Sequence, residues 1–235
     1  MSNEIDTGIT PALHPAVVSK IPGYESDEAV RQVVAPTETA FSSAYNAVQS
    51  VWTARALIEK DTSKTEDARL LQLDTFAGKQ LAAVGKTFDA TLANLNRSIA
   101  FLEGELSMPL ISKAGTAMGA EIRAHVKGMT TAQRQEFIQT AIDSGDEETA
   151  AAVLGAKHYL TGITAQMQQA LTRGWNSKMQ PDKAKRLTAM QGAKGLIEEH
   201  AGKVFVELEK AVGGSSKKAK AIREAQAAAD KAVAG

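Results

Sequence analysis

The feature that most constrains the fold is a run of large apolar residues three or four positions apart. The run comprises Leu81, Val84, Phe88, Leu92, Leu95, Ile99, Leu102 and Leu106. A repeat that averages near 3.5 residues keeps one side of an α-helix facing a partner along its whole length, as in a coiled coil. We therefore predict one helix over residues 64–107, about 65 Å long at 1.5 Å per residue.

A second run of this kind predicts another long helix over residues 181–212. It comprises Leu187, Met190, Ile197, Val204 and Leu208, and it follows Pro181, a residue favoured at first helical positions. We call the residues of both runs the seam. The two runs can pair within one chain or contact other chains. We favour pairing within the chain for most of the seam. We also expect some of the first helix to remain for another subunit, because the helices predicted between residues 110 and 175 are short.

Capping residues mark those shorter helices. Thr130 followed by Gln133 is typical of a capping box, in which each side chain bonds a free amide of the other residue. Gly145 suits the end of that helix and Asp146 the start of the next. Thr161 is a candidate cap for a later helix. No stretch predicts a β-strand, so the expected class is all-α.

Two features limit the first long helix. Ser63 with Glu66 predicts a second capping box at its start. Pro109 predicts a bend or a break after it, because proline lacks an amide donor and crowds the preceding turn.

The two ends of the chain differ from its middle. Residues 1–36 hold four of the six prolines and predict an extended arm, although a brief helix over residues 26–34 is an alternative. The arm is either a loose terminus or a segment that packs against a neighbouring subunit. Residues 213–235 predict a Gly/Ser joint and a Lys/Ala-rich tail. The expected organisation is an elongated helical bundle over residues 37–212 between this arm and this tail.

Composition and motifs argue against catalysis. The four histidines lie far apart in the sequence, and the chain contains no cysteine. It also lacks a phosphate-binding glycine loop, a nucleophile elbow and a His-Glu-x-x-His pattern. We therefore expect no enzymatic activity, cofactor or metal. No run of 18 apolar residues and no signal-peptide pattern occurs, so we expect neither a membrane span nor secretion by a signal peptide.

The charge of the chain argues against nucleic acid as a partner. Basic and acidic residues number 27 each, so the net charge gives no long-range attraction to phosphate. The tail offers the candidate contacts Lys217, Lys218, Lys220 and Arg223, which predict only a weak, salt-sensitive interaction. Residues 131–156 have the outline of a helix-turn-helix, but three carboxylates at the start of its second helix would repel DNA.

Residues 129–163 resemble a stretch of helical proteins encoded by tailed bacteriophages and prophages. The shared features are an Arg and a Phe in the first helix, the Ser144-Gly145-Asp146 turn, an Ala-Val-Leu run and a Leu-Thr-Gly close. The chain departs from that pattern at Lys157-His158, where a proline is common. The resemblance implies a virion-associated or assembly protein in the head or neck region.

The leading hypothesis is a structural protein of a phage particle, a homo-oligomer that contacts its neighbours through its arm and long helices. One alternative is a DNA-associated or regulatory protein that acts through its tail. Another is a scaffolding or adaptor protein that is absent from the mature assembly. A phage-encoded protein of this kind would be found in the virion, and otherwise in the cytoplasm.

Overall fold

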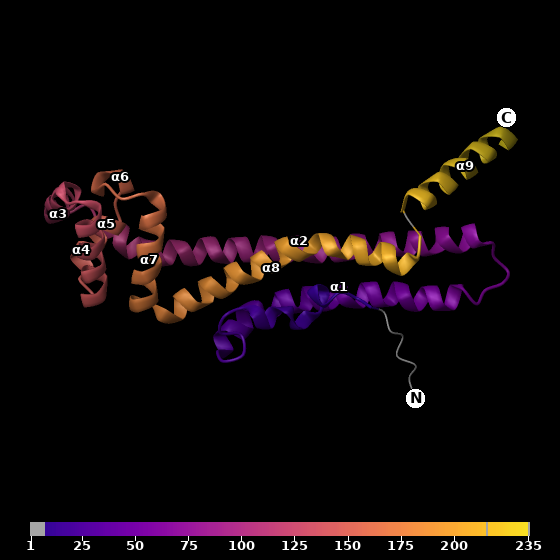
Figure 1. Cartoon of the computed structure of the whole chain (residues 1–235), viewed down its shortest axis with the longest axis horizontal. Helices are drawn as coiled ribbons and strands as arrows, with labels where there is room; N and C mark the ends of the chain where they lie inside the picture. The colour runs from indigo at the N-terminus through magenta and orange to yellow at the C-terminus, as the bar shows by residue number, and fades with distance from the viewer. Residues whose placement is uncertain (1–7, 215, 235) are drawn as a thin grey trace. The chain divides into compact units, whose positions relative to one another are not determined.

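The computed structural model describes residues 8–214 and 216–234, which form α-helices, two short 3₁₀-helices and connecting turns (Figure 1). No strand occurs in this part of the chain, which confirms the all-α class. In place of the single bundle predicted over residues 37–212, the helices form two compact units. Unit 1 takes the described residues up to Leu95 and from Gly192 onward, and unit 2 takes residues 96–191.

Both predicted long helices are present, and each contributes to both units. The first is α2, Glu66–Lys113, which runs further than predicted. The second is α8, Pro181–Val212, with the predicted bounds. In unit 1 the first part of α2 and the last part of α8 run beside α1, Glu28–Ile58 (Figure 1).

Phe41 of α1 marks the centre of unit 1. Its side chain is fully buried, and its ring lies 5.5 Å from the ring of Phe88 on α2 and 6.2 Å from the ring of His200 on α8, measured between centroids. The three helices therefore share one core at this level.

The prediction of an extended arm is wrong for the described residues 8–36; residues 1–7 lie outside the described part. Two 3₁₀-helices, η1 (Pro11–Leu13) and η2 (Pro15–Lys20), pack on α1 and bury apolar side chains within the chain itself. These side chains are Leu13, Val17, Val18 and Ile21. Each 3₁₀-helix begins with proline, whose missing amide is tolerated at a first helical position.

Two prolines lie inside helices that the sequence rule would end. Pro36 is in α1, which begins at Glu28 behind the N-cap Asp27, so the boundary predicted at residue 36 is wrong. Pro109 is in α2, which continues to Lys113. A proline in a helix interior costs about 3 kcal/mol. Buried neighbours on both sides offset that cost, as Val34 and Phe41 do around Pro36.

The capping box predicted at the start of α2 is also wrong. The hydroxyl of Thr65 accepts the hydrogen bond from the amide of Ala68, which makes Thr65 the capping residue. Ser63 instead donates its amide and hydroxyl protons to the carboxylate of Asp61. These two hydrogen bonds, the one from the hydroxyl foremost, lower the pKa of Asp61.

Unit 2 contains the shorter helices. They are α3 (Ala117–Gly128), α4 (Thr131–Ser144), α5 (Glu147–Leu154), α6 (His158–Thr161) and α7 (Ala165–Met179). The capping box of Thr130 and Gln133 is confirmed, as are the left-handed Gly145 and the N-cap Asp146. The predicted capping role of Thr161 is wrong, because that residue ends α6 and Thr164 caps α7.

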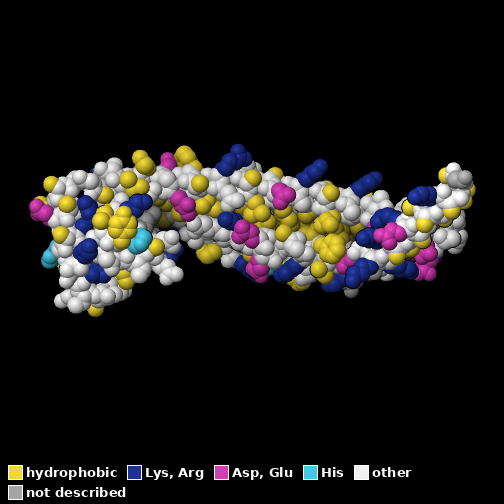
Figure 2. Space-filling view, turned by 90° about the horizontal axis from the view of Figure 1, so that it is seen from above, with side chains coloured by type: hydrophobic (Ala, Val, Ile, Leu, Met, Phe, Trp, Pro, Cys, Tyr) yellow, Lys and Arg dark blue, Asp and Glu magenta, His cyan; other side chains and the backbone are white. Residues whose placement is uncertain are grey.

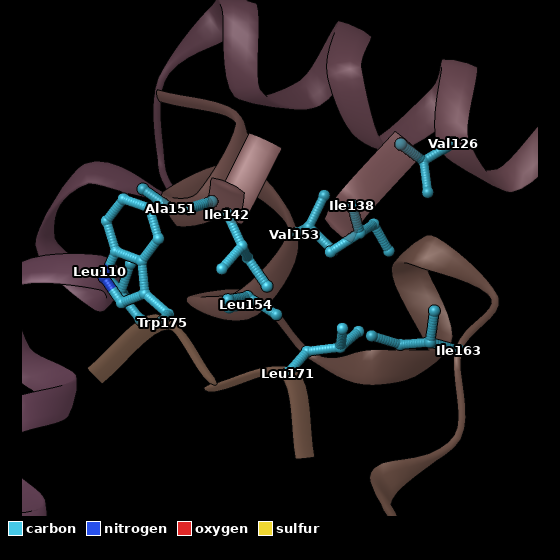
Figure 3. Close-up of a cluster of buried hydrophobic side chains, with 11 residues drawn as sticks. Leu110, Val126, Ile138, Ile142, Ala151, Val153, Leu154, Ile163, Leu171 and Trp175 are labelled. Carbon is cyan, nitrogen blue, oxygen red and sulfur yellow. The ribbon is translucent and has the colours of Figure 1, made fainter. Parts of the chain in front are cut away.

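The core of unit 2 forms around the short helix α5. Every residue from Thr149 to Leu154 is buried. Figure 3 shows Val153 and Leu154 beside Ile138 and Ile142 of α4, with Leu171 and Trp175 of α7 in the same cluster. Helix α5 therefore holds α4 and α7 together through buried aliphatic contacts.

A substitution at Gly155 tests this close packing. A β-carbon at Gly155 would overlap the backbone carbonyl of Leu110 on α2, whereas one at Gly174, inside α7, would meet no atom. We expect Gly155→Ala to lower the free energy of unfolding of unit 2 by about 1–3 kcal/mol. Gly174→Ala should raise it by about 0.5–1 kcal/mol, because alanine favours helix. Urea denaturation followed by Trp175 fluorescence in a Trp52→Phe background measures both effects. A neutral Gly155→Ala would contradict the contact.

The environment of His200 predicts that the stability of unit 1 depends on pH. Burial and then the charge of Lys203, whose Nζ lies 2.8 Å from Nδ1, lower the pKa of His200 below its ordinary value of 6.5. The unfolded chain therefore binds a proton that the folded chain does not. We expect the stability of unit 1 to be highest above pH 6.5 and to decrease as pH falls through the lowered pKa.

The measurement is urea denaturation followed by Trp52 fluorescence in a Trp175→Phe background, between about pH 7.5 and pH 5. His200→Leu should flatten this pH dependence relative to the parent protein. His125→Gln, at an exposed histidine of unit 2, serves as the matched control and should leave it unchanged. Equal slopes for the parent and His200→Leu would refute the assignment.

Candidate protein-docking groove

The structure places every residue of the seam inside the chain's own packing. In unit 1 the side chains are buried or half-buried: Leu81, Val84, Phe88, Leu92, Leu95, Ile197, Val204 and Leu208. The same holds in unit 2 for Ile99, Leu102, Leu106, Leu187 and Met190. The seam therefore packs within the chain, as favoured for most of its length, and a contact of the seam with neighbouring subunits stays a prediction.

The basic residues of the tail also find partners within the chain. Helix α9, Ser216–Ala234, is linked to α2 by an ion pair of 2.6 Å between Arg223 and Asp74. Lys218 lies 3.7 Å from a carboxylate oxygen of Glu66, and Lys220 pairs with Glu224 on its own helix. Lys217 is exposed. These ion pairs weaken the case for a nucleic-acid contact through the tail, because phosphate would have to displace carboxylates.

The joint before α9 is packed rather than open. A β-carbon at Gly213 would overlap the guanidinium of Arg55, and one at Gly214 would lie 2.7 Å from Leu70 Cδ1. Arg55 also approaches the carbonyl of Lys210, 3.5 Å from its Nη1, in the last turn of α8. The two glycines therefore leave room for the side chains of Arg55 and Leu70 to pack against this turn. Ser215 and Gly235 lie outside the described residues.

Helix α2 carries a second apolar face in unit 2, and this face is exposed. The side chains of Phe101, Met108 and Ile111 are 68%, 61% and 54% exposed. Their spacing of seven and three residues puts them on one side of the helix, and Gly104 falls on the same side. We call Phe101, Met108 and Ile111 the exposed stripe. The spacing was visible in the sequence, but it resembles that of the buried run.

A groove opens beside the exposed stripe, because Gly104 and Ile111 line it. Its volume is about 1130 Å³, and all of its lining residues belong to unit 2. One wall is the end of α2 with the turn after it, from Glu103 to Gly115, and the others are residues 154–160, α7 and the start of α8. The buried side chains of Leu106, Leu110 and Leu154 give it apolar lining. Figure 2 shows hydrophobic and basic side chains close together at the surface over α3–α6.

Polar side chains of the groove hold its walls in place. Gln168 on α7 donates from Nε2 to the carbonyls of Leu154 and Ala156, at 2.9 and 2.7 Å. Arg123 on α3 donates from Nη1 to the carbonyls of Ala114 and Ala152, at 2.7 and 3.3 Å. Both side chains satisfy carbonyls near helix ends, which a helix leaves without an internal partner.

Asn176 on α7 is different, because its buried amide oxygen has no hydrogen-bond partner. The residue is 8% exposed and lines the groove. A buried acceptor without a donor costs about 1–3 kcal/mol. The chain therefore keeps an unsatisfied acceptor beside this groove at a cost to its stability.

The groove has more positive than negative charge. Lys157 and Arg173 are exposed and form no ion pair with any residue in the described part of the chain. Arg123 adds a third cation, although backbone carbonyls engage its guanidinium. The one carboxylate in the lining, Glu103, accepts a hydrogen bond of 3.1 Å from Gln191.

Within residues 8–214 and 216–234, no three His, Asp or Glu side chains come together in a way that could hold a metal ion. None of the described helices combines the length and the apolar character that crossing a membrane requires.

Comparisons of the chain with protein-family models, with curated proteins and with solved structures found no match. The exposed stripe and the groove are the features of the structure from which a function can be inferred.

Proposed function

We propose that this chain is a non-enzymatic structural protein that binds neighbouring protein subunits through unit 2. The observation that carries the proposal is the exposed stripe. Three large apolar side chains on one helix face, each more than half exposed, cost solvation free energy unless another surface covers them. Single exposed apolar residues need no such explanation, but an aligned set at helical spacing does.

Self-association is the simplest way to cover this face. The net charge of zero gives the copies no long-range repulsion, and a helix face can pack against the same face of a second copy. We therefore propose a homo-oligomer within a larger assembly.

The particle of a tailed phage is the assembly that we propose. The stretch that resembles phage helical proteins, residues 129–163, forms α4, α5 and α6. These helices belong to unit 2, which also carries the exposed stripe. The resemblance supports a virion-associated role in the head or neck region.

The triple variant Phe101→Gln/Met108→Gln/Ile111→Gln tests the stripe. We expect the parent protein to form a discrete oligomer in light scattering, and the triple variant to approach the monomer mass of 24.9 kDa. The physical reason is that glutamine keeps helix propensity but removes the apolar area that association would bury.

The matched control is Leu57→Gln/Phe205→Gln/Val206→Gln, which alters three exposed apolar residues of unit 1. It should keep the oligomer. A parent protein that remains monomeric at every concentration would refute self-association. An equal loss of mass in the control would show that the stripe is not the contact.

A further inference from the structure

We infer that the groove of unit 2 binds an acidic segment with large apolar side chains from a partner protein. This inference rests on the proposed function and names the chemistry of the partner. Three features of the groove lead to it: its apolar lining, its excess of positive charge, and the unsatisfied oxygen of Asn176.

The apolar lining calls for large apolar side chains in the partner. Leu106, Leu110 and Leu154 are at most 7% exposed, and the half-buried Leu187 lies beside them in the lining. On the α2 side, Ile111 is 54% exposed, so the groove is continuous with the exposed stripe. Burial of such surface drives most protein association, and leucine-type side chains would fill the groove with the largest gain.

The positive charge of the groove indicates that the bound segment carries negative charge. The exposed cations Lys157 and Arg173 stand on two different walls, residues 154–160 and α7, and neither has a carboxylate partner in the described residues. Carboxylates on a bound segment would supply these partners and speed its association. The ion pairs of Lys113 with Glu147 and of Lys183 with Glu105 involve neither Lys157 nor Arg173.

The same charge argues against the tail of a second copy as the occupant. The first turns of α9 contain Lys217, Lys218, Lys220 and Arg223. A second copy would bring these cations toward Lys157 and Arg173, and like charges in contact are unfavourable. A different, acidic protein segment fits better.

Asn176 adds a polar requirement. Its buried Oδ1 lacks a donor, whereas the side-chain amide nitrogen of Gln168, also on α7, donates to the carbonyls of Leu154 and Ala156. A bound polypeptide brings N–H groups into the groove, and one of them would complete the hydrogen bonding of Asn176.

The length of the groove sets the size of a test ligand. The helical part of the wall, from Glu103 to Lys113, spans about 15 Å at 1.5 Å per residue. A peptide of roughly 12 residues covers this length as a helix and exceeds it when extended.

The experiment uses the full chain and two fluorescein-labelled peptides of that length. One contains only leucine and glutamate in an amphipathic pattern, and the other has lysine in place of every glutamate. Fluorescence anisotropy measures binding to the parent protein and to Lys157→Glu/Arg173→Glu. We expect saturable binding of the acidic peptide that the double variant weakens at least about tenfold, together with weak binding of the lysine peptide.

Two further variants separate the groove from general effects. Lys127→Glu/Arg186→Glu makes the same change in net charge at exposed residues of unit 2 outside the groove, and should alter binding by less than about twofold. Asn176→Leu should weaken binding while the protein resists urea at least as well as the parent. Trp175 fluorescence confirms that unit 2 is folded in each variant.

Absence of binding by the acidic peptide would overturn the inference. So would equal binding of both peptides, or equal losses in the two charge-reversal variants. The outcome is separable from that of the proposed function. Charge-dependent peptide binding by a protein that remains monomeric would support the groove and refute self-association. An oligomer that loses mass in the stripe variant but binds no acidic peptide would support self-association and refute the groove.

Discussion

The structure depends on how the chain covers its longest helix. Helix α2 has 48 residues, and its continuous apolar run needs a partner along the whole length. In unit 1, α1 and the last part of α8 supply that cover, with the rings of Phe41, Phe88 and His200 at their meeting point. In unit 2 the cover is incomplete, because Leu102 and Leu106 are buried while Phe101 and Met108, one or two positions away, are not.

Local signals in the sequence were sufficient for much of the fold. The capping box at Thr130, the left-handed Gly145 and the N-cap Asp146 depend only on neighbouring residues, and all three are confirmed. The interior prolines and the N-terminal segment were mispredicted for the opposite reason. Whether a helix passes through Pro36, or whether Leu13 packs on α1, depends on burial against distant residues, which local propensity does not contain.

The candidate site was harder to predict than the fold. A spacing of three or four residues located Leu102 and Leu106, and a spacing of seven, the sum of the two, relates Phe101 to Met108. Periodicity shows that residues share a helix face, but it does not show which face the rest of the chain will cover. The groove could not be found at all from the sequence, because its walls are residues 103–115, 154–160, 168–177 and 184–191, and only packing brings them together. An uncovered apolar face and an unpaired amide oxygen become visible once the fold is known.

We propose that the exposed stripe is free in one chain and covered when chains associate. Because the sequence lacks cysteine, a spin label can be placed at Met108→Cys alone, with Leu57→Cys as the equally exposed reference. We expect the electron paramagnetic resonance spectrum to show that the label at position 108 becomes immobilised as protein concentration rises, while the label at position 57 stays mobile. Immobilisation at position 57 with a mobile label at position 108 would contradict this proposal.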